Sequence, residues 1–503
     1  MTGVRLYGTV AACAAIVYGG ALWNQFAMDD NQIVAFNKLV LQFGGVWRAF
    51  VSPYWPSVVG GGLYRPLPLA SYAIDWQLGG AAWWFHAVNV AWHAGASVAV
   101  AWLAQRWTGE PRSSERGERA ALAAGLLFAV HPVHVEAVAN IVGRAELMAA
   151  LFAILCVYAA LAQDRLWWSA AALAAGLLSK ENAVVAPALI AWGWIMEMAR
   201  PSRRRMVAYV ATWVAVGAVY VMARWYVLGH ELVGRAAPVF FGASPVAVRL
   251  TAVAAFPDVA RLLVFPLKLR ADYSPAERTL VATPLDPRFA LGLLCVAAWA
   301  ALLWLAWRRG RRLEAFGLGW IAIAFFPVSN LAVQVGVLVA ERTLYLPSVG
   351  LAWAAGALLR GLESRRLAWV LSLLAVAGGL RTAVRVPVWR DQRSVVLSEV
   401  TDSPRSFAGP AQMVVLDLVE HQPARALESF RKAAGLTDLK LPWLYEAGAE
   451  AAFAAGQATV ADSILDSLEA GCPRCRSYYR TAAAIARIRG YPAAADSFLA
   501  RAK

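Results

Sequence analysis

Apolar runs of about 16 to 25 residues recur along the first 386 positions, with short polar segments between them. A helix needs roughly 20 apolar residues to cross a hydrocarbon core about 30 Å thick. The pieces between residues 145 and 180 are short enough to be tilted or partly buried. We therefore predict about eleven transmembrane helices, at residues 5–27, 83–105, 119–138, 145–162, 165–180, 183–199, 206–228, 289–307, 314–330, 344–360 and 367–386.

A further apolar stretch, residues 249–267, is not counted among these helices. It contains Pro257, Asp258, Arg261 and Pro266, which are costly at the centre of a lipid-facing helix. We expect it to lie in the membrane interface or to be re-entrant. Eleven crossings then predict a cytoplasmic N-terminus and an external C-terminus.

The pattern changes after residue 386, where charged and small residues alternate with alanine at helical spacing. Three segments share one frame, because Ala426, Ala461 and Ala495 follow one another at intervals of 35 and 34 residues. Gly456 and Gly490 each stand five residues before such an alanine, where a turn between two helices belongs. The period is typical of tetratricopeptide repeats, so residues 387–503 predict an α-solenoid. The alternative is an irregular helical tail.

Cys472 and Cys475 fall between two of these repeats. An external location permits a local disulfide, and the neighbourhood does not offer the two further ligands of a zinc site. The sequence does not decide whether the two thiols are joined.

Composition agrees with a membrane protein, since 60% of the 503 residues are hydrophobic and only 16% are charged. The net charge of +15 would suggest nucleic-acid binding in a soluble protein. Here the arginines cluster in loops, and cytoplasmic loops are enriched in basic residues. We therefore expect no nucleic-acid partner, and the arginine-rich composition indicates a bacterial inner membrane. The clusters are Arg106 to Arg119, Arg200 to Arg205, Arg308 to Arg312 and Arg360 to Arg366.

The predicted external face holds several polar groups, of which the first is in the loop of residues 28–82. Asp29 and Asp30 follow the first helix directly, and Tyr64 and Arg65 precede an amphipathic stretch that we expect at the membrane interface. Two adjacent carboxylates can differ in pKa, so that one is ionised as a general base. A helix cap or a solvated pair is the structural alternative.

A second group is at the outer end of the span that ends at residue 138. It contains His131, His134 and Glu136, and Arg144 and Glu146 follow. Two histidines and a glutamate allow a metal site, but Pro132 leaves their helical geometry open. We expect hydrogen bonding or substrate contact, without a metal.

Two further groups each contain a cation. Lys180, next to Glu181, stands between two apolar runs, and a cation there must be paired with a carboxylate or a lipid phosphate. Glu341, Arg342 and Tyr345 precede a later span, where an interfacial anchor is the structural alternative. Asp272-Tyr273-Ser274 is a weaker signal.

These motifs, in this order and followed by the repeats, resemble the transmembrane and tetratricopeptide-repeat (TMTC-like) O-mannosyltransferases. The resemblance covers nearly the whole chain, although the animal members have far more repeats. It implies a GT-C glycosyltransferase domain at residues 1–386, which moves mannose or another hexose from a polyprenyl-phosphate carrier to an external acceptor. It rests on Asp29-Asp30, Tyr64-Arg65-Pro66-Leu67, His131 to Val138 with Gly143 to Glu146, Lys180-Glu181-Asn182, Asp272-Tyr273-Ser274 and Glu341 to Ser348.

The resemblance also implies roles for the residues. The family's catalytic acid in the first external loop corresponds to Asp29 or Asp30, which would act as the base in an inverting transfer. Arg65, Arg144, Lys180 and Arg342 are then the candidates to hold the donor phosphate, with no metal and no other cofactor. We expect the remaining polar residues of these motifs in the substrate pocket, namely Tyr64, His131, His134, Glu136, Glu146, Glu181, Glu341 and Tyr345.

Two other functions remain open at the level of sequence. A transporter or flippase also has many spans with charged residues, although internal repeats among the spans are not evident. A non-catalytic scaffold would use its membrane domain only to present the repeats to partners. The repeats could bind a protein acceptor in either case, and the sequence identifies neither the sugar, the acceptor nor the oligomeric state.

Overall fold

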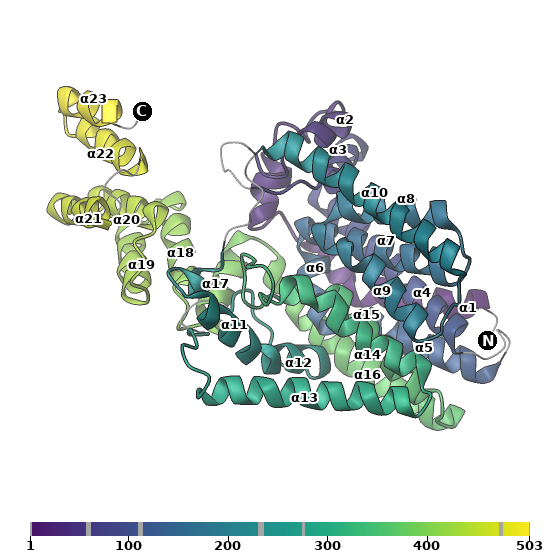
Figure 1. Ribbon diagram of the computed structural model, residues 1–503. Helices are drawn as coiled ribbons and strands as arrows, with labels where there is room; N and C mark the ends of the chain where they lie inside the picture. Colours follow the sequence, from purple (N-terminus) through teal and green to yellow (C-terminus); the bar gives the residue numbers. More distant parts are fainter. Residues whose placement is uncertain are drawn as a thin grey trace. The chain divides into compact units, whose positions relative to one another are not determined.

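The protein is an all-helical polytopic membrane protein (Figure 1). The computed structural model describes residues 3–56, 62–108, 114–229, 236–273, 277–471 and 476–501, and these residues contain no strands. They divide into two compact units, one formed by residues up to Leu269 with Leu280–Gln392, the other by Arg270–Thr279 with Arg393–Lys503.

The helices of the first unit form a bundle whose core is built from buried alanine, leucine and aromatic side chains. Close approach of the helices depends on small residues, as between α14 and α15, where a Cβ on Gly317 would lie 2.3 Å from the Gly350 carbonyl oxygen. The helices are α1 (Gly3–Tyr18), α2 (Gly45–Arg48), α3 (Pro66–Leu78), α4 (Ala82–Trp107), α5 (Glu115–Ala129), α6 (Val135–Ala139), α7 (Arg144–Leu161), α8 (Leu166–Ser179), α9 (Ala186–Ile195), α10 (Arg203–Leu228), α11 (Pro245–Ala254), α12 (Phe256–Val264), α13 (Pro287–Arg308), α14 (Arg312–Phe325), α15 (Tyr345–Leu359) and α16 (Ser364–Arg385).

Six helical segments in the described residues are long and apolar enough to cross a membrane, or seven if the pair formed by α5 and Pro132–Ala139, bent by 46°, is one span. The helices α8, α9, α14 and α15 have only 10 to 15 residues. At 1.5 Å per residue, 14 residues cover about 21 Å, less than a full hydrocarbon core. The count of eleven crossings therefore stays a prediction. The six segments are Gly3–Trp23, Ala82–Trp107, Ile141–Leu161, Arg203–Leu228, Pro287–Arg308 and Ser364–Trp389.

The basic loops gather at one end of the bundle. Arg119 donates to the carbonyl oxygen of Leu362 at 2.8 Å, and Arg360 donates to that of Thr108 at 3.2 Å. Arg312 pairs with Glu197 at 2.6 Å, which joins two further loops. This shared location is what the basic bias of cytoplasmic loops predicts. The side of the membrane on which this end lies stays a prediction.

Segment 249–267 forms parts of two short helices, α11 and α12, which meet at Ala255. Both pack against α13, and neither is long enough to cross a bilayer (Figure 1). The segment therefore cannot be a single straight span. Its place in the interface stays a prediction.

The second unit consists of helices in antiparallel pairs: α18 with α19, α20 with α21, and α22 with α23. Gly456 and Gly490 lie at the turns with φ of 77° and 81°, a left-handed conformation that favours glycine. Its helices are α17 (Gln392–Asp402), α18 (Ala408–Val419), α19 (Pro423–Gly435), α20 (Pro442–Ala454), α21 (Ala458–Gly471), α22 (Arg476–Ile488) and α23 (Pro492–Arg501).

The three alanines that define the predicted period are buried in this unit. Each helix pair thus contributes to a common core, although the tetratricopeptide assignment itself stays a prediction. Cys472 and Cys475 lie outside the described residues.

The unit also contains Arg270–Thr279, which the sequence did not predict. The Asp272 carboxylate accepts a hydrogen bond from Ser406 at 2.6 Å, and the Asp272 carbonyl oxygen accepts one from Ser403 at 2.6 Å. Asp272 therefore holds this segment within the second unit. Ser274 lies outside the described residues.

Candidate functional site

A cavity of about 1140 Å³ opens in the first unit, at the ends of the helices opposite the basic loops. Helix α10 runs from the basic end to the cavity. Arg205, in its first turn, belongs to a basic cluster and binds Asp164 of the α7–α8 loop, whereas Arg224, near its last turn, lines the cavity. One part of the wall carries charged side chains from five segments of the chain: the first loop, the start of α7, the junction after α8, the end of α10 and the short helix Glu341–Leu344. The other part is apolar and comes from α9, α14 and residues 326–337.

The two adjacent aspartates have different surroundings. Asp29 lines the cavity, and none of the described residues donates a hydrogen bond to its carboxylate. Burial raises the pKa of Asp29 above 3.8, Arg342 opposes the shift, and Glu136 adds to it. Asp29 therefore combines the access and the basicity that a general base needs.

Asp30 is buried and points the other way. Its carboxylate accepts hydrogen bonds from the backbone N–H groups of Val142 at 2.8 Å, Ile141 at 3.3 Å and Ala27 at 3.3 Å. Burial raises the pKa of Asp30 to about 7 against the effect of these three donors. Asp30 thus ties the first loop to the chain that precedes α7, and of the two predicted catalytic acids only Asp29 lines the cavity.

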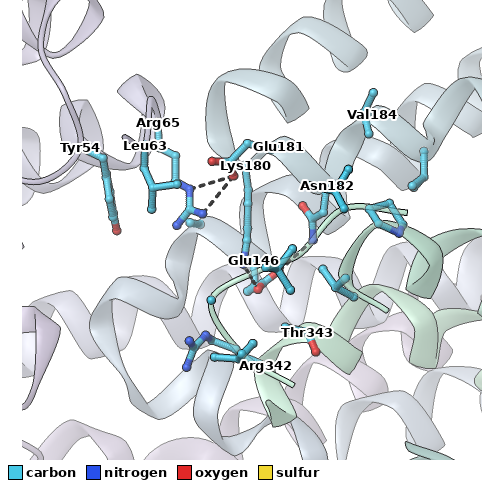
Figure 2. A pocket seen from close by; sticks show the side chains of 18 of the residues that line it. Tyr54, Leu63, Arg65, Glu146, Lys180, Glu181, Asn182, Val184, Arg342 and Thr343 are labelled. Carbon is cyan, nitrogen blue, oxygen red and sulfur yellow. Dashed lines mark hydrogen bonds and ion pairs between the residues drawn. The ribbon is translucent and has the colours of Figure 1, made fainter. Parts of the chain in front are cut away.

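Lys180 enters the cavity wall from the junction of α8 and the short helix Glu181–Val185 (Figure 2). Its ammonium group pairs with one oxygen of Glu146, and the other oxygen of Glu146 accepts a hydrogen bond from the Asn182 amide at 3.0 Å. The pair therefore keeps a cation in a largely apolar wall.

Glu181 joins two arginines. The Arg65 Nε and Nη2 atoms lie 3.1 and 3.0 Å from Glu181 Oε2, and Arg224 Nη1 lies 3.5 Å from Glu181 Oε1. Arg224 also donates to the carbonyl oxygen of Gly62 at 2.8 Å. Three segments far apart in the sequence are fixed together at this side of the cavity, and Figure 2 shows the contact between Arg65 and Glu181.

Arg342 reaches the cavity from the short helix Glu341–Leu344. The Glu136 carboxylate behind it binds it twice, through the guanidinium group and through the Arg342 backbone N–H at 2.8 Å. The Glu136 side chain is 2% exposed, whereas that of Arg342 is 36% exposed. Glu136 therefore positions Arg342 and does not itself line the cavity, contrary to the sequence prediction.

Arg144 is a second correction. It was predicted to bind the donor phosphate, but it is fully buried and does not line the cavity. Its guanidinium pairs with Asp75 and donates to Asn89 at 2.8 Å and to the Phe85 carbonyl oxygen at 3.0 Å. Tyr72 stacks on it at 4.7 Å. With its donors engaged in this way, Arg144 joins α3, α4 and α7.

Five other residues predicted in the pocket do not line it. Tyr64 donates to the Phe50 carbonyl oxygen at 2.9 Å, and Glu341 is buried. His134 bonds with Ser348 at 2.7 Å, and His93 with the Tyr345 hydroxyl at 2.8 Å.

The fifth of these residues is His131, which bonds with the Leu263 carbonyl oxygen at 2.8 Å. Together with His134 and Tyr345 it joins the helix ends around α6. The two histidines of this motif thus make contacts between helix ends. The described residues contain no group of three or more His, Cys, Asp or Glu that could hold a metal ion.

Several polar lining residues were missed as site residues, among them Asn140, Asn182 and Arg224. Arg224 lies inside a predicted span, where an ionisable residue is a signal of function. Asn182 belongs to the motif Lys180-Glu181-Asn182, but a neutral amide is common in loops, so neither asparagine was singled out as a site residue. The sequence prediction and the structure agree on Asp29, Arg65, Glu146, Lys180, Glu181 and Arg342 as residues that lie around one cavity.

Curated proteins similar to this chain are protein O-mannosyl-transferases. TMTC4 of Homo sapiens is 29% identical over 79% of this chain and 61% of its own length, and TMTC3 of Mus musculus is 25% identical over 78% and 46%. Tmtc2 of Drosophila melanogaster is 35% identical over 34% of this chain and 20% of its own length. The predicted resemblance is thus confirmed, and the chain spans about three-fifths of the first of these relatives.

No family model matches the chain. No solved structure matches it either.

Proposed function

We propose that this protein is an inverting glycosyltransferase that moves mannose or another hexose from a polyprenyl-phosphate carrier to a protein acceptor at the external face of the membrane. The observation that carries the proposal is a single cavity lined by the Asp29 carboxylate, by four cations and by an apolar wall. The names of the similar proteins support sugar transfer to protein. The bacterial inner membrane and the periplasmic side stay predictions.

The reaction follows from these groups. The acceptor hydroxyl oxygen attacks the anomeric carbon while the carbon–oxygen bond to the phosphate breaks, and the hydroxyl proton passes to the Asp29 carboxylate. Attack opposite to the leaving group inverts the anomeric carbon. The phosphate monoester of the lipid leaves with the bonding electrons, and cations stabilise its growing negative charge.

The charges of the wall suit a donor with one phosphate. Four cations line the cavity (Arg65, Lys180, Arg224 and Arg342), against the three carboxylates of Asp29, Glu146 and Glu181. A phosphodiester between lipid and sugar carries one negative charge, and cations that line the cavity can donate charge-assisted hydrogen bonds to it beside their carboxylate partners. The apolar wall of α9, α14 and residues 326–337 suits the first isoprene units of the carrier.

A transfer assay tests the proposal directly. Purified protein in a lipid nanodisc, given a polyprenyl phosphate with a radiolabelled mannose and a mixture of serine- and threonine-containing peptides, is expected to release the sugar-free lipid and label a peptide. Absence of both, with a protein that remains folded by circular dichroism, contradicts the proposal. Movement of the intact donor between leaflets without transfer would favour a flippase.

Removal of one cation is expected to weaken donor binding. Charge-assisted hydrogen bonds to phosphate contribute about 1.5–3 kcal/mol, so Arg342→Gln or Lys180→Gln should raise the Kd for the donor by about 10- to 100-fold. The measurement is titration with the lipid donor. Arg48→Gln is the matched control, because Arg48 is an exposed arginine of the first loop that does not line the cavity. Unchanged affinity in both cavity variants contradicts the assignment.

A further inference from the structure

The side-chain amide of Asn182 is held in one orientation in the cavity wall. Its Nδ2 atom donates to Glu146 Oε2 at 3.0 Å, and the residue is only 7% exposed. A flip of the amide would place the amide oxygen against the Glu146 carboxylate, and both groups are hydrogen-bond acceptors. The positions of the amide nitrogen and oxygen are therefore fixed. Its oxygen Oδ1 is buried and accepts no hydrogen bond from the described residues. Figure 2 shows this oxygen on the side away from Glu146.

Asn140, which also lines the cavity, has a second buried acceptor without a partner among the described residues. The residue is 5% exposed, and its Oδ1 atom also accepts no hydrogen bond from the described residues. The backbone around it is well satisfied, because Asn89 Nδ2 donates to the carbonyl oxygens of Val138, Asn140 and Ile141. The backbone of this loop is therefore held by hydrogen bonds, whereas the Asn140 side-chain oxygen has no donor among the described residues.

Buried acceptors of this kind indicate a ligand that brings hydrogen-bond donors. A phosphate has only acceptor oxygens and is repelled by an amide oxygen, and an isoprenoid chain has no donors at all. A sugar hydroxyl donates one hydrogen bond and can replace a water molecule at the same position. Of the three parts of the proposed donor, only the sugar matches these two atoms.

We propose that Asn182 and Asn140 form the sugar-binding subsite of this cavity, with their amide oxygens accepting hydrogen bonds from hydroxyl groups of the hexose. The inference rests on the proposed function and adds to it the residues that recognise the sugar. Glu146 has an indirect part, because its two oxygens are occupied by Lys180 and by Asn182. It links the cation expected at the phosphate to the amide expected at the sugar.

Two lipid probes distinguish the contribution of the sugar to binding from that of the phosphate. The probes are a short-chain polyprenyl phosphate bearing mannose and the methyl ester of the same polyprenyl phosphate, which keeps one negative charge and lacks the sugar. The unaltered protein is expected to bind the mannosyl lipid at least about tenfold more tightly. Asn182→Leu should reduce this ratio toward one and leave the affinity for the methyl ester within about twofold.

Asn140→Leu is the second variant, for the case in which Asn182→Leu does not fold. The control is Gln32→Leu, which changes an exposed side-chain amide in the first loop. A buried amide such as that of Asn330 is unsuitable, because its hydrogen bonds to Val335 and Val337 stabilise its loop. Mannosyl lipids that each lack one hydroxyl group test the unaltered protein without any substitution. One or two of them should lose the preference.

The outcomes distinguish this inference from the proposed function. If the unaltered protein prefers the mannosyl lipid and neither asparagine variant nor any deoxy sugar changes the ratio, the subsite is overturned while the donor class stands. If the unaltered protein binds the two lipids equally, the subsite is overturned as well. If it binds neither lipid, the proposed function itself fails.

Discussion

Asp29→Asn is expected to lower the rate of sugar transfer by about 10³-fold, the largest loss among the cavity variants, with donor affinity within a few fold of the unaltered protein. A positioned general base contributes typically 10²- to 10⁴-fold, and an amide cannot take a proton from the acceptor hydroxyl. Asparagine has nearly the same shape, and the described residues make no hydrogen bond to the Asp29 carboxylate that the change would break. Single-turnover kinetics with saturating donor measures the chemical step.

Asp30→Asn is the matched control, since it makes the same change one residue along the chain. The Asp30 carboxylate accepts three backbone hydrogen bonds, and an amide cannot accept all of them. The substitution should therefore lower the free energy of unfolding by about 1–3 kcal/mol and affect the chemical step much less. A reversed pattern, with Asp30→Asn inactive yet stable and Asp29→Asn active, contradicts the assignment of the base.

The pH dependence of transfer gives an independent check on Asp29. Because burial raises the pKa of Asp29, its carboxylate takes up a proton as the pH falls through a value above the ordinary 3.8. The protonated form cannot act as a base, so kcat/KM should fall on the acidic side at a pH higher than 3.8. Asp29→Asn should remove this limb from its residual activity, and an identical limb in the variant would assign it to another group.

The sequence could predict which segments meet but not which side chain of each segment faces the cavity. Asp29, Lys180 and Arg342 stand at helix ends on the same predicted face, so the topology alone brings them near one another. Within a segment, neighbouring residues on a helical turn point about 100° apart. Asp29 and Asp30 therefore face different surroundings, as do Arg144 and Glu146, which are two residues apart at the start of α7.

The roles of Glu136 and the histidines were beyond prediction for a related reason. Helix α6 has only five residues, too few for its apolar pattern to show which face is buried. The bond from Glu136 to Arg342 spans 206 positions, and only the packed structure brings them together. Short spans such as α9 were also hard to judge, because an apolar run of that length fits a buried core helix as well as a crossing.

The largest effect on stability is expected from Arg144→Met. Arg144 and Asp75 form a buried pair, with 0% and 6% of their side chains exposed, and removal of one partner leaves an uncompensated charge. Such a change typically costs about 3–5 kcal/mol. The variant should also lose the bonds to Asn89 and Phe85, so a lower thermal unfolding temperature and a poorer yield in detergent are expected.

The double variant Asp75→Leu with Arg144→Met provides the decisive comparison. Replacement of both partners by apolar groups removes the unpaired charge, so part of the stability should return relative to Arg144→Met alone. Because Arg144 does not line the cavity, any stable form of the double variant should bind the donor as the unaltered protein does. A stable Arg144→Met protein whose only defect is a loss of donor affinity would return Arg144 to the phosphate-binding set and contradict the structural role.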